Sequence, residues 1–152
     1  MIEKEKKMAN KVKKYKQTEI PKVTIIENRD LGKYMSKFYA ENLQGKSVVN
    51  KDLGMTITFT SVGKNEISYG RALYAKKAAI ITCLEKLMEV AEYNNFGERK
   101  ETDKKNIIGY LNFKAKVLIN DKLENVRITV QFKKDGKMYF KPYYNHEINI
   151  KK

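Results

Sequence analysis

Residues 111–132 read LNFKAKVLINDKLENVRITVQF, and this stretch decides the fold. Apolar side chains occupy every second position in both of its halves: Leu111, Phe113, Ala115, Val117 and Ile119, and then Val126, Ile128, Val130 and Phe132. Alternation with a period of two residues is typical of β-strands that bury one face. Asn120 and Asp121, followed by Lys122, can form the turn between the two strands. The stretch therefore predicts an antiparallel strand pair with one apolar and one polar face.

A third strand is expected to follow this pair. Residues 134–137, Lys-Asp-Gly-Lys, favour a turn because Asp-Gly accepts positive φ angles, and they lead into an apolar and aromatic run at 138–144. Pro142 has no N–H to donate, so this strand is expected at a sheet edge. The prediction is a C-terminal three-stranded antiparallel meander. Its polar face carries four cations: Lys114, Lys116, Arg127 and Lys133.

Two main helices are expected to cover the apolar face. The first follows Asp30, a favourable N-cap residue, and ends near Gly45; the second spans the longest helical pattern, residues 73–91. Between them, alternation over residues 47–61 predicts a small β-hairpin. The polar residues 94–106 are expected to form a loop that joins the second helix to the meander.

The fold class that follows is α+β, with two main helices packed on one face of an antiparallel sheet that ends in the three-stranded meander. Residues 1–20 are rich in lysine and poor in apolar residues, so we expect a flexible N-terminal segment. Residues 21–152 are expected to form a single α+β domain, because their length and apolar content suit one hydrophobic core.

The charge balance indicates the class of partner. The chain has 32 Lys and Arg against 18 Asp and Glu, a net charge of +14. Such a balance favours a polyanion, since neutralising phosphates releases counterions; a lysine-rich composition that only maintains solubility is the alternative. We find no apolar leader and no apolar run near 18 residues, and Cys83 is the only cysteine. We therefore expect a cytosolic protein, in whatever cell makes it, with no membrane contact.

The sequence offers no visible site for a metal or a nucleotide cofactor. A structural zinc needs four Cys or His ligands, and the chain has one of each. Neither a Walker-type loop nor a Gly-x-Gly-x-x-Gly motif is present. Cys83 falls in an apolar helical run, which favours a small core residue rather than a nucleophile. We therefore expect no cofactor.

Candidate nucleic-acid contacts fall in three groups. The first group is the cations at the start of the second helix, where the helix N-terminus also favours anions. The others are the cations on the polar strand face and the tyrosines that can stack on unpaired bases. Together the three groups comprise Arg71, Lys76, Lys77, Lys114, Lys116, Arg127, Lys133, Tyr143 and Tyr144. For each cation, ordinary solvation on the surface is the alternative. The combination predicts binding of RNA or single-stranded nucleic acid.

Residues 139–146, Tyr-Phe-Lys-Pro-Tyr-Tyr-Asn-His, are the candidate catalytic segment. His146 is the only histidine, and its ordinary pKa suits an acid or a base near neutral pH. With Lys141 to stabilise a phosphate, and Arg127 or Arg71 as a further cation, it could support metal-independent RNA cleavage. In the alternative interpretation, His146 ends an edge strand and the tyrosines fill the core or its rim.

Several runs of the chain, over about residues 40 to 150, resemble a known family. They are Gly45–Asn50, Gly54–Phe59, Gly63–Lys64, Leu87–Tyr93, Phe113–Val117, Asn120, Val126 and Tyr143–His146. The chain resembles the large polyvalent-protein-associated domains of phages and mobile elements, which look like members of the barnase, EndoU, colicin and RelE nuclease superfamily. The resemblance implies an α+β fold and RNase activity, and His146 is the one polar residue that it carries over. A second histidine is absent.

Two hypotheses of function follow. In the first, a phage or mobile-element nuclease-like domain binds RNA or single-stranded nucleic acid through its basic sheet face and cleaves RNA without a metal. In the second, a non-catalytic anti-defence protein, an inhibitor of the anti-CRISPR type, uses the same surface to occupy a host nucleoprotein complex. A DNA-processing accessory of a transfer element is a third possibility. Small size and high positive charge fit all three.

Overall fold

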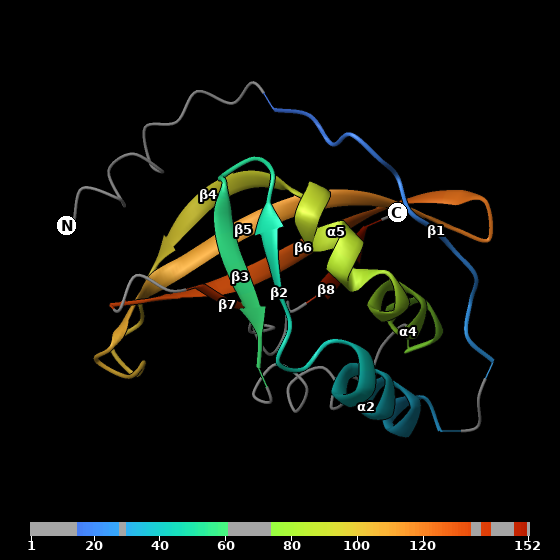
Figure 1. Cartoon of the computed structure of the whole chain (residues 1–152), viewed down its shortest axis with the longest axis horizontal. Coiled ribbons are helices and arrows are strands. Elements are labelled where there is room, and N and C mark those ends of the chain that lie inside the picture. Colours follow the sequence, from blue (N-terminus) through green and yellow to red (C-terminus); the bar gives the residue numbers. More distant parts are fainter. Residues whose placement is uncertain (1–14, 28–29, 61–73, 135–137, 141–147, 152) are drawn as a thin grey trace.

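The computed structural model describes residues 15–27, 30–60, 74–134, 138–140 and 148–151, and the following account is confined to them. Its centre is the predicted strand pair. β5 (Ile107–Ile119) and β6 (Lys122–Lys133) pair antiparallel along their whole length (Figure 1). Asn120 and Asp121 form the turn between them with φ angles of 49° and 64°. Asn and Asp tolerate this left-handed region better than most residues, which is why the turn can be so short.

The remaining strands extend this pair into one sheet of eight strands (Figure 1). They are β1 (Lys22–Val23), β2 (Ser47–Asn50), β3 (Met55–Phe59), β4 (Glu92–Glu98), β7 (Met138–Phe140) and β8 (Ile148–Lys151). On the edge of β5 that faces away from β6, β4 pairs with residues 109–114 and β1 with residues 118–119. On the edge of β6 that faces away from β5, β8 pairs with residues 125–128 and β7 with residues 130–132. Beyond β7, the sheet continues through β3 to β2.

The predicted meander and the predicted hairpin are both confirmed. β5, β6 and β7 are consecutive antiparallel neighbours, and β2 pairs antiparallel with β3. Two parallel pairings, β1 with β5 and β3 with β7, are added to them. At residues 138–140 the third strand is an inner strand, because β7 pairs with β6 on one side and with β3 on the other. The edge position was expected at Pro142, which lies outside the described residues, so it stays a prediction.

Helices α2 (Leu31–Asn42), α4 (Tyr74–Thr82) and α5 (Leu84–Val90) lie on the apolar side of the sheet (Figure 1). Asp30 caps α2 as predicted, because its side chain accepts a hydrogen bond from the N–H of Lys33 at 3.0 Å. The single long helix expected over residues 73–91 is divided at Cys83. There the Cys83 N–H bonds to Ile80, a tighter pattern than the α-helical one. The Thr82 hydroxyl also bonds back to the carbonyl of Ala79.

The hydrophobic core lies between these helices and the sheet. The alternating apolar residues of β5 and β6 are all at most 4% exposed, and they pack on helical side chains that are fully buried, among them Ile80, Leu84, Leu87 and Met88. The α+β class with helices on one face of the sheet is therefore confirmed. Of the described helices, none is long and apolar enough to cross a membrane.

The prediction that residues 94–106 form one loop is wrong for residues 94–98, which belong to β4. Residues 92–98 pair with β5, but a bulge between Tyr93 and Asn95 inserts an extra residue. Tyr93 and Phe96 both reach the core cluster although they are three positions apart. The bulge therefore breaks the period of two on which the sequence prediction depended.

Residues 15–23 of the N-terminal part contact β5. They lie on the same edge of β5 as β4, beyond the first residue of β4, and we call them the N-terminal strap. The Gln17 side chain replaces a backbone amide there: its Oε1 accepts from the Lys116 N–H at 2.7 Å, and its Nε2 donates to the Lys116 carbonyl at 2.8 Å. The Tyr15 hydroxyl donates to the carbonyl of Val90 at 3.2 Å. Residues 15–20 of the segment expected to be flexible are thus attached to the sheet.

Candidate nucleic-acid interface

The polar face of β4, β5 and β6 points away from the helices, and we call it the outer face. The register places Lys114 directly opposite Arg127, and Lys116 two positions further along β5. All three side chains are exposed. Among the residues that the structure describes, none forms an ion pair with Lys114, Lys116 or Arg127. Glu92 is the neighbour of Lys114 on β4, and its Oε2 accepts from the Gln17 N–H at 2.8 Å.

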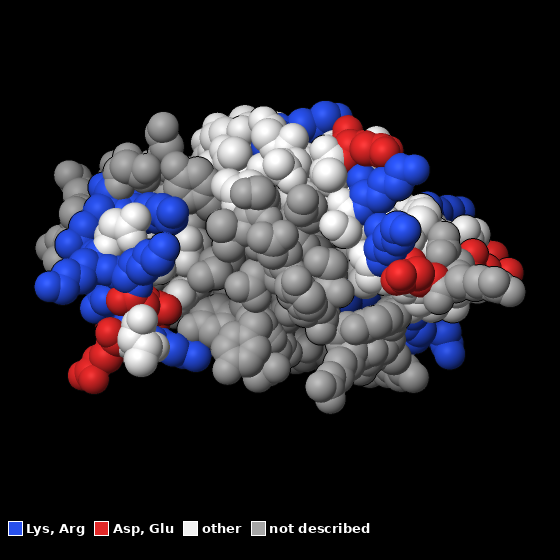
Figure 2. Space-filling model, turned by 90° about the horizontal axis from the view of Figure 1, so that it is seen from below, with Lys and Arg blue, Asp and Glu red and all other residues white. Residues whose placement is uncertain are grey.

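A second group of cations lies at the far end of the outer face, around the loop from β4 to β5 and the end of β6. We call it the basic end; it comprises Arg99, Lys100, Lys104, Lys105, Lys133 and Lys134. The loop is held in place because Arg99 Nη2 donates to the carbonyl of Asp103 at 2.7 Å and the Lys134 N–H bonds to Asn106 at 2.8 Å. Figure 2 shows Lys and Arg side chains gathered at this end of the molecule. Lys133 therefore lies apart from Arg127, six residues along β6.

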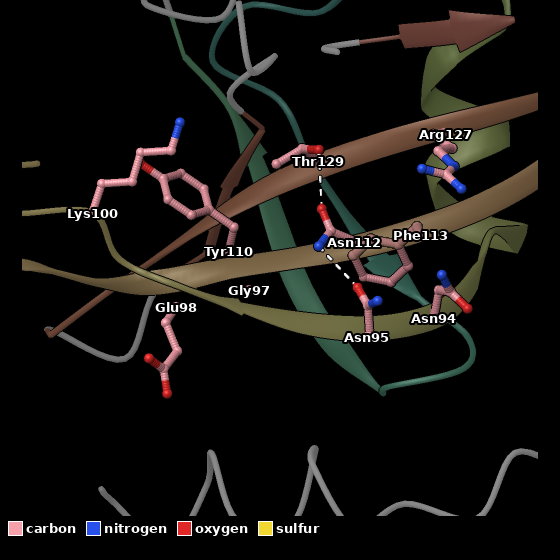
Figure 3. Close-up of a pocket in the computed structure, with 10 residues that line it drawn as sticks. All are labelled: Asn94, Asn95, Gly97, Glu98, Lys100, Tyr110, Asn112, Phe113, Arg127 and Thr129. Atoms are coloured by element: carbon pink, nitrogen blue, oxygen red, sulfur yellow. Dashed lines mark hydrogen bonds between the residues drawn. The ribbon is translucent and has the colours of Figure 1, made fainter. Parts of the chain in front are cut away.

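Between the two groups the outer face is hollowed. Tyr110, Thr129 and Gln131 are only 5–6% exposed there, although they alternate with core residues. A polar pocket of about 410 Å³ lies beside them (Figure 3). It is lined by Asn94, Asn95, Gly97, Glu98, Lys100, Tyr110, Asn112, Phe113, Arg127 and Thr129. The pocket therefore adjoins Arg127 on one side and Lys100 of the basic end on the other.

A row of hydrogen bonds crosses three strands at the pocket. Thr129 of β6 donates its hydroxyl to Asn112 Oδ1 at 3.2 Å, and Asn112 Nδ2 of β5 donates to Asn95 Oδ1 of β4 at 2.9 Å (Figure 3). Such a row fixes the side-chain amides in position, because each rotamer is held by the next strand. The pocket wall is thus a preformed polar surface.

Two of the predicted phosphate contacts lie on the other side of the sheet. Lys76 Nζ forms an ion pair with Glu124 Oε1 at 2.9 Å, and Glu124 shares the helix-covered face of β6 with Val126. Lys77 is only 7% exposed. Neither residue joins the surface that contains Lys114 and Arg127. A phosphate-binding role for the start of α4 stays a prediction, separate from the outer face.

The remaining predicted site residues lie outside the described residues. These are Arg71, Lys141, Tyr143, Tyr144 and His146, so the predicted catalytic pair of His146 and Lys141 remains a prediction. In the part of the chain that the structure describes, no group of three or more His, Cys, Asp or Glu residues could hold a metal ion. Cys83 is half-buried, and burial raises the pKa of its thiol to about 12, which keeps the thiol protonated as expected of a core residue.

Sequence reasoning missed the pocket and the basic end. Asn112 and Thr129 are visible as polar positions between apolar ones, but only the strand register shows that they are neighbours. Asn95 could not be assigned to a strand, because the bulge hides the alternation of β4. The cations of residues 99–105 fall in a polar stretch that gave no sign of lying beside Lys133 and Lys134.

Comparison with known proteins identifies the family of the chain. Neither a curated protein nor a solved structure is significantly similar to the chain. The sequence model of the large polyvalent protein-associated domain 3 family matches residues 26–144, which include every described strand except β1 and β8 and all three described helices. With most of the chain covered, this protein belongs to the large polyvalent protein-associated domain 3 family, a domain of the large polyvalent proteins of phages and mobile elements.

Proposed function

We propose that this domain binds RNA or single-stranded nucleic acid through the outer face of β4, β5 and β6. The observation that carries the proposal is the cross-strand pair Lys114 and Arg127, with Lys116 beside it, exposed and without an ion-pair partner among the described residues. Like charges directly opposite on neighbouring strands destabilise a sheet. A phosphate between them would remove that repulsion, and its counterions would be released.

The dimensions of the face suit a strand of several nucleotides. Arg127 and Lys133 of the basic end are six residues apart on β6, which is about 20 Å at the rise of an extended strand. Proteins that bind single strands contact about 4 to 16 nucleotides per domain. A strand that crosses the face could therefore place phosphates on the Lys114 and Arg127 pair and on the basic end together. The polar pocket would lie under the nucleotides between them.

The test is a comparison of two triple variants that remove equal charge. Lys114→Gln, Lys116→Gln and Arg127→Gln together change the outer face, whereas Lys33→Gln, Lys37→Gln and Lys51→Gln change exposed lysines on α2 and in the hairpin turn. Fluorescence anisotropy with a labelled single strand of about 20 nucleotides would give affinities at several salt concentrations. The outer-face variant should bind more weakly, with a salt slope reduced by about 2, because each phosphate contact on a single strand contributes about 0.7.

The control variant should retain most of the affinity and the slope. Equal losses in both variants would show that net charge, and not the outer face, determines binding. Absence of binding by the unchanged protein in about 50 mM salt would contradict the proposal altogether. RNA, single-stranded DNA and duplex DNA of equal length would be compared in the same assay, and tighter binding of the duplex would exclude a single-strand function.

RNA cleavage is the second part of the proposal, and its candidate residues, His146 and Lys141, lie outside the described residues. The segment with His146 and Lys141 follows β7, which pairs with β6 next to the outer face. Labelled RNA would be incubated in chelator with the unchanged protein, with His146→Ala and with Lys141→Ala. We expect the unchanged protein to cleave and His146→Ala to lose most activity. Equal cleavage by both would exclude His146, and no cleavage by any of them would leave binding as the function.

A further inference from the structure

Gly97 keeps the floor of the polar pocket open. A Cβ atom at this position would have its closest contacts at 3.4 Å, with Asn112 Nδ2, and at 3.9 Å, with atoms of Tyr110, so it would project into the pocket without striking the backbone of the sheet. The φ angle of Gly97 lies outside the left-handed region, and a side chain would therefore fit the local backbone. A larger residue at position 97 would fill the space that glycine leaves.

The amides around this space keep unused hydrogen-bonding capacity. Asn112 Nδ2 uses one N–H on Asn95, which leaves its second N–H and both N–H groups of Asn95 Nδ2. Asn94, which is exposed and also lines the pocket, has no side-chain hydrogen bond to any described residue. The unused N–H donors of Asn95 and Asn112 and the amide of Asn94, which has both donors and an acceptor, therefore line a pocket of about 410 Å³. This volume is within the range of small-molecule sites.

The charges at the rim are arranged for a ligand that carries phosphates on two sides. Figure 3 shows Lys100 at one side of the pocket and Arg127 at the opposite side. Glu98 also lines the pocket, and its carboxylate can accept from the N–H groups of a ligand. A nucleobase offers carbonyl and ring-nitrogen acceptors together with N–H donors, and a strand places a phosphate on either side of it.

We propose that the pocket receives one unpaired nucleobase of the bound strand, held by the amides of Asn94, Asn95 and Asn112, while Arg127 and Lys100 contact the flanking phosphates. This proposal rests on the proposed function and adds a base-binding subsite to it. The base enters over Gly97, and the row from Thr129 to Asn95 orients the amides before it arrives. Recognition is therefore by hydrogen bonds to the base edge, in addition to the charge interactions of the outer face.

The test compares a normal oligonucleotide with one of the same length and charge that lacks bases. We expect the unchanged protein to bind the normal strand about 10-fold more tightly, the effect of one well-held base. Gly97→Val should remove this preference, because its methyl groups project into the floor of the pocket beside Asn112 while the charge stays the same. Asn95→Ala, at an exposed position that carries no risk to folding, should reduce the preference in part. Gly97→Ala, which only touches Asn112, should keep it.

A double variant, Lys114→Gln with Lys116→Gln, separates this proposal from the proposed function, because neither residue lines the pocket. It should weaken binding of both strands equally and leave the 10-fold preference intact. If Gly97→Val keeps the preference while the double variant loses affinity, the pocket is not a base site but the outer face still binds nucleic acid. If no strand binds, the proposed function fails with it. Nucleoside monophosphates should compete only at about 100-fold higher concentration, and competition as strong as that of the strand would mean a free-nucleotide site instead.

Discussion

At the scale of single residues, the most unusual feature of the core is the charge pair of Lys76 and Glu124. Their side chains are 20% and 3% exposed, so both charges lie largely out of water. Glu124 Oε2 has no hydrogen-bond partner among the described residues. The ion pair with Lys76 is therefore the main interaction that stabilises the negative charge of this buried carboxylate. A buried pair of this kind adds little net stability, but loss of one partner leaves the other charge uncompensated.

Lys76→Met should therefore lower the free energy of unfolding by about 3 kcal/mol or more. Lys76→Met combined with Glu124→Met should recover most of that loss, since no buried charge remains. Urea denaturation of the three proteins measures both effects. Lys37→Met is the matched control, because Lys37 and Glu41 are 4.0 Å apart on the exposed face of α2 and such a pair contributes at most about 0.5 kcal/mol. A double variant as unstable as the single one would contradict this account.

At the scale of the elements, β4 determines the shape of the candidate site, and its position depends on a glycine in the neighbouring strand. A Cβ atom at Gly109 would lie 2.5 Å from the carbonyl oxygen of Gly97 and would overlap the ring of Phe96. The two strands can approach each other at this point only because residue 109 has no side chain. Phe96 in turn packs on the core, so β4 has little freedom to move aside.

Gly109→Ala should consequently destabilise the protein by about 1 to 3 kcal/mol, the usual cost of forcing an extra methyl group into a packed site. The strain should be local. Hydrogen exchange should accelerate for the amides of β4 and less for the pairing of β5 with β6. Gly97→Ala on the opposite strand is the control, since its nearest contact of 3.4 Å is ordinary packing. Equal stability of Gly109→Ala and the unchanged protein would show that β4 can shift without cost.

The elements also show what a sequence can reveal and what it cannot. β5 and β6 were predictable because their alternation runs unbroken on both sides of a turn that suits Asn120 and Asp121. β4 was not, because its bulge disrupts the same period. Asn50 is a further case: its Nδ2 donates to the carbonyls of Met88 and Ala91, which ties the hairpin to the end of α5. Nothing in the local sequence indicates a partner some forty residues away.

The candidate site was predictable to a similar extent. Lys114, Lys116 and Arg127 were found because alternation alone assigns them to one face, and the register then places two of them side by side. The pocket between them and the basic end depends on the register of three consecutive strands, which brings together side chains 17 positions apart, and on Gly97, whose role is to leave space. Lys76 and Lys77 were grouped with the surface cations because helix periodicity reveals neither the partner of Lys76, Glu124, nor the burial of Lys77.

At the scale of the whole molecule, the N-terminal strap covers the edge of β5 at residues 116–119, beyond the first residue of β4. It does so with few regular backbone bonds: the Leu118 N–H bonds to Pro21, the Asn120 N–H bonds to Val23, and the side chain of Gln17 supplies two more with Lys116. An exposed strand edge is prone to pair with other chains. The strap therefore contributes to solubility as well as to stability, and its Gln17 lies beside Lys116 of the outer face.

Two truncations should thus behave differently. Deletion of residues 1–14 removes none of the contacts described here, and the free energy of unfolding should stay within about 0.5 kcal/mol of that of the full chain. Deletion of residues 1–23 removes the strap and should cost about 3 kcal/mol or more, since several hydrogen bonds of about 1 kcal/mol each are lost. It should also produce concentration-dependent association, measured by light scattering, because the edge of β5 is then free.

Gln17→Ala separates the contribution of the side-chain pairing from that of the chain itself. It removes the two bonds to Lys116 and a local one to the Glu19 carbonyl but leaves the backbone bonds at Pro21 and Val23, so it should cost about 1 to 2 kcal/mol without association. A shorter truncation that unfolds the protein would mean that the domain begins before Tyr15. A longer truncation as stable and as soluble as the full chain would mean that β5 needs no cover on this side, and the domain would then begin after β1.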